Sequence, residues 1–184
     1  RWIHISDLQL GQGKAESDAS DELAAEMVRN VLDQGPDFVI HSGDCIHGTR
    51  IDGQAGANPE YEKIHEEYWQ MYRATISPLS NHCPVFSVIG NHDHTMPDLK
   101  TERFCHHNDC GDSLPYCSQL VDDVQILCLD VVPGRHLGGF LPETEQDSWL
   151  RIVLVDPAAA RCRIVVGHYP IFLATEVAYC VDKS

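Results

Sequence analysis

The fold of this chain is indicated most clearly by two stretches, Phe38-Val39-Ile40-His41-Ser42-Gly43-Asp44 and Val85-Phe86-Ser87-Val88-Ile89-Gly90-Asn91-His92-Asp93. In each, a short apolar run leads through a glycine into polar side chains, as in the buried strands of an α/β sheet. The same arrangement occurs at Ile3–Gln9 and Ile164–Pro170. Ligands of such sheets bind just past the carboxyl ends of the strands. We therefore expect these strand ends to bring their polar side chains to one edge of the fold.

The polar residues at these strand ends share one property, since each offers an oxygen or nitrogen atom to a cation. They are Asp7, Gln9, Asp44, Asn91, His92 and His168. Carboxylate, amide oxygen and imidazole form the ligand set expected for Mn, Fe or Zn. For any one residue alone, capping a strand end is the simpler interpretation. Taken together, the residues favour a metal site. His47 and His94 flank it, and solvated loop positions are the simpler interpretation for both.

Composition places the chain among ordinary soluble domains. Its 184 residues are 43% hydrophobic and 22% charged, which suits one domain with a sizeable core. No apolar run approaches the ~20 residues needed to cross a bilayer. The net charge of −15 argues against binding an extended nucleic acid. Bound dications would supply the positive field that a phosphorylated substrate needs.

The eight cysteines include no Cys-x-x-Cys pair, and a domain of this size does not need disulfides. We expect most of them to be free and buried. The stretch Cys105-His106-His107-Asn108-Asp109-Cys110 is the exception. A small disulfide loop or an adventitious metal site would fit it, although a polar surface loop is the simpler interpretation.

Hydrophobic periodicity predicts alternating strands and helices, followed by a hairpin. Leu23, Met27, Val28, Val31 and Leu32 should form the inner face of the first helix. His4 and His41 lie inside predicted strands and should be packed core groups. The expected elements are strand 2–6, helix 21–34, strand 38–41, helix 58–76, strand 85–89, hairpin 116–121 with 124–129, helix 142–153 and strand 163–166. This order predicts an α/β fold of two packed, mixed sheets with helices outside.

The ordered set Asp7-x-Gln9, Gly43-Asp44, Gly90-Asn91-His92-Asp93 and Gly167-His168 resembles the calcineurin-like metallophosphoesterase superfamily. The segments Gly139–Leu141 and Gln146–Leu150 add a likeness to its cyclic-nucleotide phosphodiesterase and purple-acid-phosphatase-like branch. The resemblance implies a four-layer α-β-β-α sandwich and a centre of two divalent ions, Mn, Fe or Zn. It covers nearly the whole chain, so we expect one metallophosphoesterase domain over residues 1–184.

The resemblance also implies a role for each residue of these motifs. Asp7 would bind the first metal, Asp44 would bridge both metals, and Asn91 and His168 would bind the second. His92 would hydrogen-bond the phosphate or protonate the leaving oxygen, and Asp93 would orient His92. Two cations ~3.5–4 Å apart can hold a phosphoryl oxygen and stabilise the charge of an in-line attack.

The sequence departs from the family pattern at two places. Position 9 is Gln where the family usually has His, so Gln9 would either ligate through its oxygen or act as a hydrogen bonder beside the ligands. The closing Gly-His-x-His motif is absent. We expect that segment to lie beyond Ser184, and a depleted site is the alternative.

The implied function is a metal-dependent phosphoesterase in which a metal-bound hydroxide attacks phosphorus. The expected substrate is small and nucleotide-like: a phosphodiester, a cyclic nucleotide or a nucleotide diphosphate linkage. A phosphomonoesterase, including a phosphoprotein phosphatase, is the first alternative. A non-catalytic interaction module with a degraded metal site is the second, and a nuclease is disfavoured by the negative charge.

Overall fold

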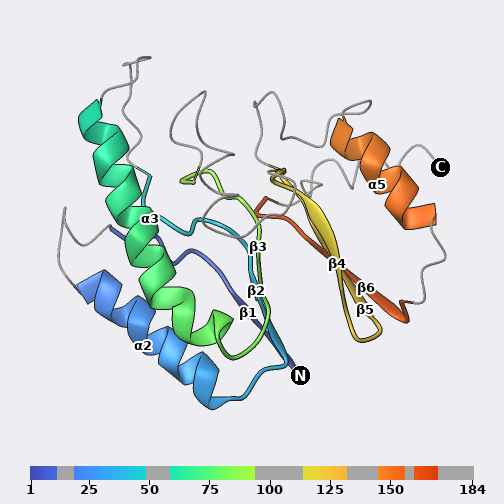
Figure 1. The fold of residues 1–184 in the computed structure, drawn as a ribbon, viewed down its shortest axis with the longest axis horizontal. Coiled ribbons are helices and arrows are strands. Elements are labelled where there is room, and N and C mark those ends of the chain that lie inside the picture. The colour runs from blue at the N-terminus through green and yellow to red at the C-terminus, as the bar shows by residue number, and fades with distance from the viewer. Residues whose placement is uncertain (12–18, 49–58, 94–113, 132–144, 156–159, 170–184) are drawn as a thin grey trace, which may run out of the picture.

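The computed structural model describes residues 1–11, 19–48, 59–93, 114–131, 145–155 and 160–169. Within them the chain forms two three-stranded sheets and the helices that flank them (Figure 1). The elements are β1 (Trp2–Ile5), α2 (Ala19–Asp33), β2 (Phe38–His41), α3 (Pro59–Ser80), β3 (Val85–Ser87), β4 (Cys117–Val121), β5 (Val124–Cys128), α5 (Glu145–Val155) and β6 (Cys162–Val166). Every element expected from the sequence is present.

The two sheets differ in strand direction. The first has the order β1-β2-β3 and is parallel throughout its described strands. The second has the order β4-β5-β6, in which β4 and β5 are antiparallel and β5 and β6 are parallel. The second sheet is thus mixed as predicted, whereas the described strands of the first sheet are all parallel. Its strands are joined through α2 and α3, and a helical crossover returns the chain to the same end of the sheet.

The layers follow the order helix, sheet, sheet, helix, which confirms the α-β-β-α sandwich (Figure 1). Val39, Val28 and Tyr72 belong to the core between the first sheet and helices α2 and α3. Ile40 and Phe86 meet Ile126 in the core between the two sheets. A smaller core, which includes Leu127, Leu129 and Leu150, joins the second sheet to α5. Each sheet is thus covered on both faces.

Helix α2 has the predicted amphipathic pattern with one correction. Val28 and Val31 are buried as expected, and Ala24 joins them. Leu23, however, is 63% exposed. The buried stripe consists of Ala24, Val28 and Val31, which are four and three residues apart, and Leu23 lies just outside it.

Helix α3 is four residues longer than its predicted end at Ile76, because it continues to Ser80 and includes Pro78. Leu79 in this last turn is fully buried, so packing holds a turn that propensity alone would not favour. Tyr68, Trp69 and Tyr72 are buried on the inner face of the helix and belong to the core.

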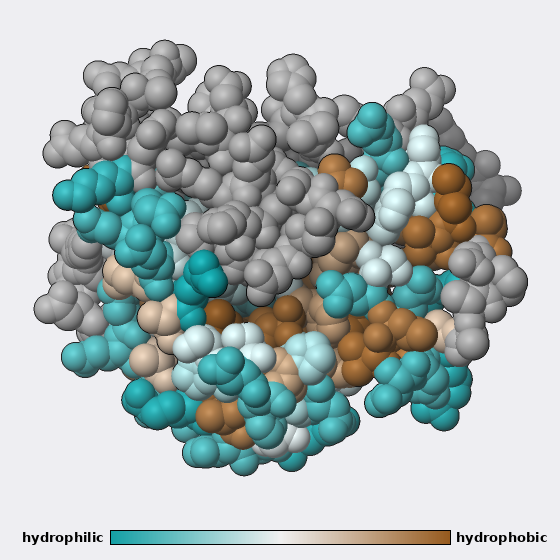
Figure 2. Space-filling view, viewed as in Figure 1, coloured by the Kyte–Doolittle hydropathy of each residue, from teal (hydrophilic) through white to brown (hydrophobic). Residues whose placement is uncertain are grey.

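The surface of the second half carries exposed apolar side chains over α5 and the second sheet (Figure 2). They are Leu120, Ile152, Leu154, Val155 and Val165. No helix within the described ranges is both long enough and apolar enough to cross a membrane.

None of the described cysteines is in a disulfide, and most of them are buried, as the sequence predicts. Cys45, Cys83 and Cys128 are buried, whereas Cys117 is half-buried and Cys162 is exposed. The stretch 105–110 lies outside the described residues.

His41 confirms its predicted place in the core, because its side chain is fully buried at the end of β2. Its Nδ1 lies 3.3 Å from Cys45 Sγ, and its ring lies against that of Tyr72 with the centroids 5.7 Å apart. Its Nε2 has no hydrogen-bond partner. Burial lowers the pKa of His41 to about 3, although the charge of Asp7 acts in the opposite direction. The ring is therefore held neutral.

This burial predicts a loss of stability in acid. Below a pH of about 6.5 the unfolded chain protonates position 41, while the folded chain does not until the pH nears its lowered pKa of about 3. We expect His41 to remove about 2 kcal/mol of unfolding free energy between pH 7.5 and pH 5.0. Urea unfolding of the wild type and of His41→Met at both pH values measures this contribution.

In His41→Met, the difference in unfolding free energy between pH 7.5 and pH 5.0 should be smaller than in the wild type by about 2 kcal/mol, whatever the absolute stability of the variant. His82 is exposed, so His82→Met is the matched control and should keep the wild-type difference. An equal pH dependence in the wild type and His41→Met would contradict the prediction.

Candidate metal centre

The site is built where the segments that follow β1 and β2 run side by side. The backbone pairing of these strands continues past their ends, since the N–H of Asp7 donates to the carbonyl of Gly43 over 3.0 Å. The N–H of Gln9 likewise donates to the carbonyl of Asp44 over 3.0 Å. Asp7 and Asp44 are thereby fixed next to each other, as the strand-end argument predicts.

The backbone at this edge adopts an uncommon conformation. Asp7, Gln9 and Asp44 have φ values of +56°, +42° and +55°. Among the described residues the only other non-glycine residue with positive φ is Asp122 at +52°, in the turn between β4 and β5. Left-handed geometry costs about 1–2 kcal/mol per residue, and such outliers gather at functional sites. Here they fall on three predicted ligand positions.

Side chains that suit a cation converge at this edge. One ligand atom from each of Asp7, Asp44 and His168 lies within 4.8 Å of the others. Asp44 is 2% exposed. Two carboxylates and an imidazole from three separate strand ends thus share a small volume. Asp7 is exposed, whereas the buried carboxylate of Asp44 needs compensating positive charge, which a divalent ion would provide.

His168 gives the clearest test of whether a metal fits. Its Nδ1 lies 2.8 Å from the carbonyl oxygen of Ser42, which can only accept, so Nδ1 carries the proton. In the neutral tautomer with this proton the lone pair is on Nε2, which lies 3.0 Å from Asn91 Oδ1 and 3.5 Å from Asp44 Oδ1. In that tautomer three acceptor atoms face one another, and either a metal cation among them or a second proton on the ring would hold them together. These oxygen and nitrogen atoms therefore fit the metal ion that the resemblance implies.

Gln9 occupies the other side of Asp44. Its Nε2 donates to Asp44 Oδ2 over 3.3 Å. Of the two alternatives that the sequence leaves open, this geometry is that of a hydrogen bonder beside the ligands. The other oxygen of Asp44, Oδ1, accepts the backbone N–H of His92 over 2.8 Å. Both carboxylate oxygens are thus oriented.

His92 lies at the edge of this cluster. Its Nε2 is 3.9 Å from Asp44 Oδ2, and its side chain is 29% exposed. Its ring stacks on that of His47 with a centroid distance of 5.4 Å. His47 is half-buried, so it is only partly solvated. His94 lies outside the described residues.

Asp93 makes different contacts from those predicted. The resemblance assigns it to orienting His92, but its carboxylate accepts backbone N–H groups of Cys45, Ile46 and Gly90 over 2.9, 3.2 and 2.8 Å. His92 Nδ1 is buried without a hydrogen-bond partner. Burial raises the pKa of Asp93 to about 7, although these three hydrogen bonds lower it. Asp93 therefore ties the segment after β2 to the segment after β3.

Gly90 allows these two segments to touch. A Cβ at this position would lie 2.2 Å from Asp44 Oδ1 and 2.3 Å from the Asp44 backbone nitrogen. Gly43, with φ of +101°, would place a Cβ 2.8 Å from His168 Nδ1. The glycines of the two motifs are thus required by close packing around the predicted ligands.

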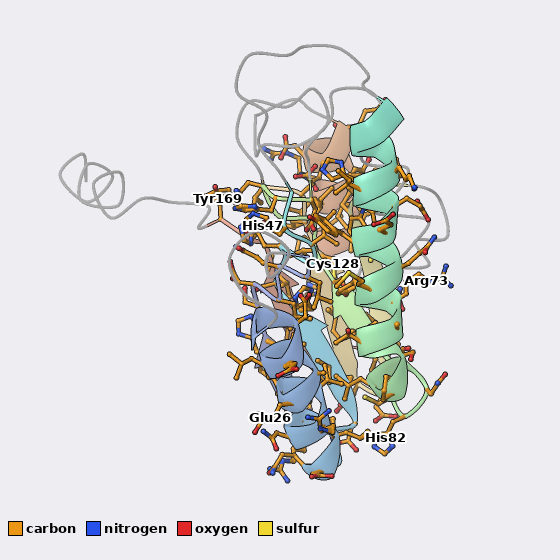
Figure 3. All side chains as sticks on the ribbon, turned by 90° about the vertical axis from the view of Figure 1, so that its left-hand side faces the viewer. Glu26, His47, Arg73, His82, Cys128 and Tyr169 are labelled. Atoms are coloured by element: carbon orange, nitrogen blue, oxygen red, sulfur yellow. The ribbon has the colours of Figure 1, made fainter. Side chains whose placement is uncertain are left out.

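Sequence reasoning did not single out Tyr169, which directly follows His168. Its hydroxyl donates to Asn91 Oδ1 over 2.9 Å, and its ring meets that of His168 edge to face. Tyr169 and His47 lie beyond the strand ends, whereas Glu26 and His82 lie at the opposite end of the molecule (Figure 3). Adjacency to His168 was the one signal that could have identified it.

Comparison with known families agrees with this geometry. The calcineurin-like phosphoesterase family matches residues 1–183. The chain belongs to that family. Membership implies a dinuclear metal site, in agreement with the converging donors Asp7, Asp44 and His168. No curated protein sequence is a significant match.

Two solved structures share the fold. One is a dimetal phosphatase from Danio rerio, with 17% identity and a TM-score of 0.50, where the match covers 83% of this chain and 50% of that one. The other is the purple acid phosphatase PPD1 from seeds of Lupinus luteus, with 16% identity and a TM-score of 0.55, covering 100% of this chain and 32% of that one. The chain thus spans half the length of the first protein and about a third of the second.

Proposed function

We propose that this chain hydrolyses phosphoric esters at a dinuclear centre of divalent ions (Mn, Fe or Zn) held by Asp7, Asp44, Asn91 and His168. The observation that carries the proposal is the convergence of carboxylate, amide and imidazole acceptors on one point beside Asp44. When bound, the ions would supply Lewis acidity and positive charge toward the phosphoryl oxygens. Family membership supports this reaction class.

The proposed metal ligands differ in the charge that they bring to the centre. Asp7 and Asp44 contribute negative charge, while Asn91 and neutral His168 contribute lone pairs without charge. Two dications would therefore keep a net positive charge that attracts an anionic phosphate. The Nδ1 hydrogen bond of His168 to Ser42 keeps the lone pair on Nε2, facing the centre.

His92 is the proposed proton donor or phosphate contact. It is partly exposed beside Asp44, and its backbone N–H is fixed by the Asp44 carboxylate. An imidazole in this place can hydrogen-bond a phosphoryl oxygen or give a proton to the leaving oxygen.

We expect His92→Gln to lower kcat about 10²-fold, which is the lower end of general acid contributions. Metal content should stay at the wild-type value, because the predicted ligands remain. The measurement is steady-state hydrolysis with added Mn, together with metal analysis of the same samples. His82→Gln, at the exposed far end, is the control for a histidine replacement. Unchanged kcat in His92→Gln would remove His92 from the mechanism.

For the substrate we propose a small, nucleotide-like phosphodiester or nucleotide diphosphate linkage. Tyr169 supports this choice, because its ring is 37% exposed directly beside Asn91 and an exposed aromatic ring can stack on a nucleobase. The net charge of −15 disfavours an extended nucleic acid. Turnover of a chromogenic bis-ester and of the matching mono-ester, each with Mn and with a chelator, tests the proposal. Faster turnover of the mono-ester would favour the phosphomonoesterase alternative.

A non-catalytic module is the second candidate, and Gln9 is the observation that favours it. Its amide nitrogen, rather than its oxygen, faces Asp44. The Asp7 side of the centre therefore has one metal-ligating atom fewer than it would have if Gln9 bound the metal. Metal analysis of the full-length protein separates the candidates. Less than one metal ion per chain, together with no Mn-stimulated turnover, would favour the module.

A further inference from the structure

A continuous chain of hydrogen bonds links the exposed side chain of His4 to Asp7. His4 Nε2 lies 2.8 Å from Ser42 Oγ, and Ser42 Oγ lies 2.9 Å from Ser6 Oγ. Ser6 Oγ in turn is hydrogen-bonded to Asp7 Oδ2. The chain starts on β1, crosses to the residue after β2 and returns to the segment after β1. It therefore joins two neighbouring strand ends at the candidate metal centre.

The direction of every bond in this chain is fixed by the number of protons available. An ionised Asp7 carboxylate can only accept, so the single hydroxyl proton of Ser6 must be donated to it. Ser6 Oγ must then accept the hydroxyl proton of Ser42, and Ser42 Oγ must accept from His4. His4 therefore carries its proton on Nε2 and donates.

The position of His4 agrees with such a role and not with the predicted one. The sequence places it in the core, but its side chain is exposed. Ser42 has a second connection to the centre, because its carbonyl oxygen accepts the Nδ1–H of His168 over 2.8 Å. One residue thus positions a carboxylate through its side chain and an imidazole through its backbone.

We propose that His4, Ser42 and Ser6 form a positioning chain that orients the Asp7 carboxylate for metal binding. The proposal rests on the metal centre of the proposed function. Ser6 holds Oδ2 of Asp7, which leaves Oδ1 for the cation. Groups that orient a ligand in this way typically change metal affinity by about 10–100-fold. His4 is then a residue of the metal centre that does not touch the metal.

The test is titration of the metal-free full-length protein with Mn by calorimetry. Ser6→Ala and His4→Leu should each weaken the binding of Mn about 10-fold. His4→Gln should retain wild-type affinity, because its amide Nε2–H reaches a position similar to that of the imidazole and can donate to Ser42. Ser80→Ala, which removes an exposed hydroxyl at the end of α3, is the control and should bind as the wild type does.

A second comparison distinguishes positioning from mere packing. Because His4 acts through Ser6, the double variant His4→Leu/Ser6→Ala should lose no more affinity than Ser6→Ala alone. Additive losses, equal affinity in His4→Leu and the wild type, or no rescue by His4→Gln would each overturn the proposal.

The readout also separates this inference from the proposed function. A wild-type protein that binds Mn without hydrolysing any ester would disprove the function, and the variants would still report on the positioning chain. A wild-type protein that binds no Mn would overturn both.

Discussion

Replacing Asp44 with asparagine should abolish hydrolysis, with a loss of about 10³-fold in kcat/KM. Asp44 is the carboxylate at which the other groups meet, since His92, His168 and Gln9 all lie within 4 Å of its two oxygens. The amide removes the negative charge that would hold the cations. Metal-free protein titrated with Mn should show weakened binding in the same variant.

Asparagine is the most informative replacement, because it has nearly the same shape as aspartate but carries no charge. It tolerates the φ of +55° at this position, and its Oδ1 can still accept the N–H of His92. Asp122→Asn is the matched control, because Asp122 has a similar φ of +52° in a turn away from the site. It should keep full activity. Activity retained by Asp44→Asn would show that the reaction does not use this centre.

Replacing Gly90 with alanine should remove activity and destabilise the fold together. The new Cβ would lie 2.2 Å from Asp44 Oδ1 and 2.3 Å from the Asp44 backbone nitrogen. Because part of this contact is with backbone, no rotamer change can relieve it. We expect a cost of about 3 kcal/mol in unfolding free energy, at the upper end of ordinary overpacking. Urea unfolding, Mn titration and steady-state hydrolysis of the same preparation measure the effects.

Gly35→Ala separates this steric effect from the general cost of replacing a glycine. Gly35 has a φ of +57°, and no atom lies within 4 Å of the place that a Cβ would take, so alanine there costs only backbone strain of about 1 kcal/mol. Its activity and Mn affinity should equal those of the wild type. If Gly90→Ala keeps wild-type Mn affinity, the contact with Asp44 does not matter for the centre.

The predictions that succeeded depend on local chemistry. The apolar runs before Gly43 and Gly90 indicate buried strands, because a strand covered on both faces favours apolar side chains at successive positions. The residues that follow such strands must lie at the sheet edge. Asp7, Asp44 and His168 could therefore be placed together from the sequence, and their ligand atoms do converge.

The predictions that failed concern packing between elements. Leu23 is apolar and lies near the expected stripe, yet it is exposed because α2 turns a slightly different face to its neighbours. The predicted end of α3 is too early, since Pro78 is a strong local stop signal and only the burial of Leu79 explains why the helix continues. Propensity has no information on such tertiary contacts.

The candidate site shows the same division. The sequence by itself determined which chemical groups are available and at which edge of the fold they gather. The apolar run that marks each strand and the polar residues at its end are adjacent in the chain, so local sequence is enough to recognise them. Only the tertiary structure decided their partners: Asp93 binds backbone N–H groups instead of His92, and His4 is connected to Asp7 through Ser42 and Ser6. These contacts form between separate strand ends, and their geometry depends on how closely the segments pack. Hydrogen bonds act over about 3 Å, so sequence spacing cannot specify them.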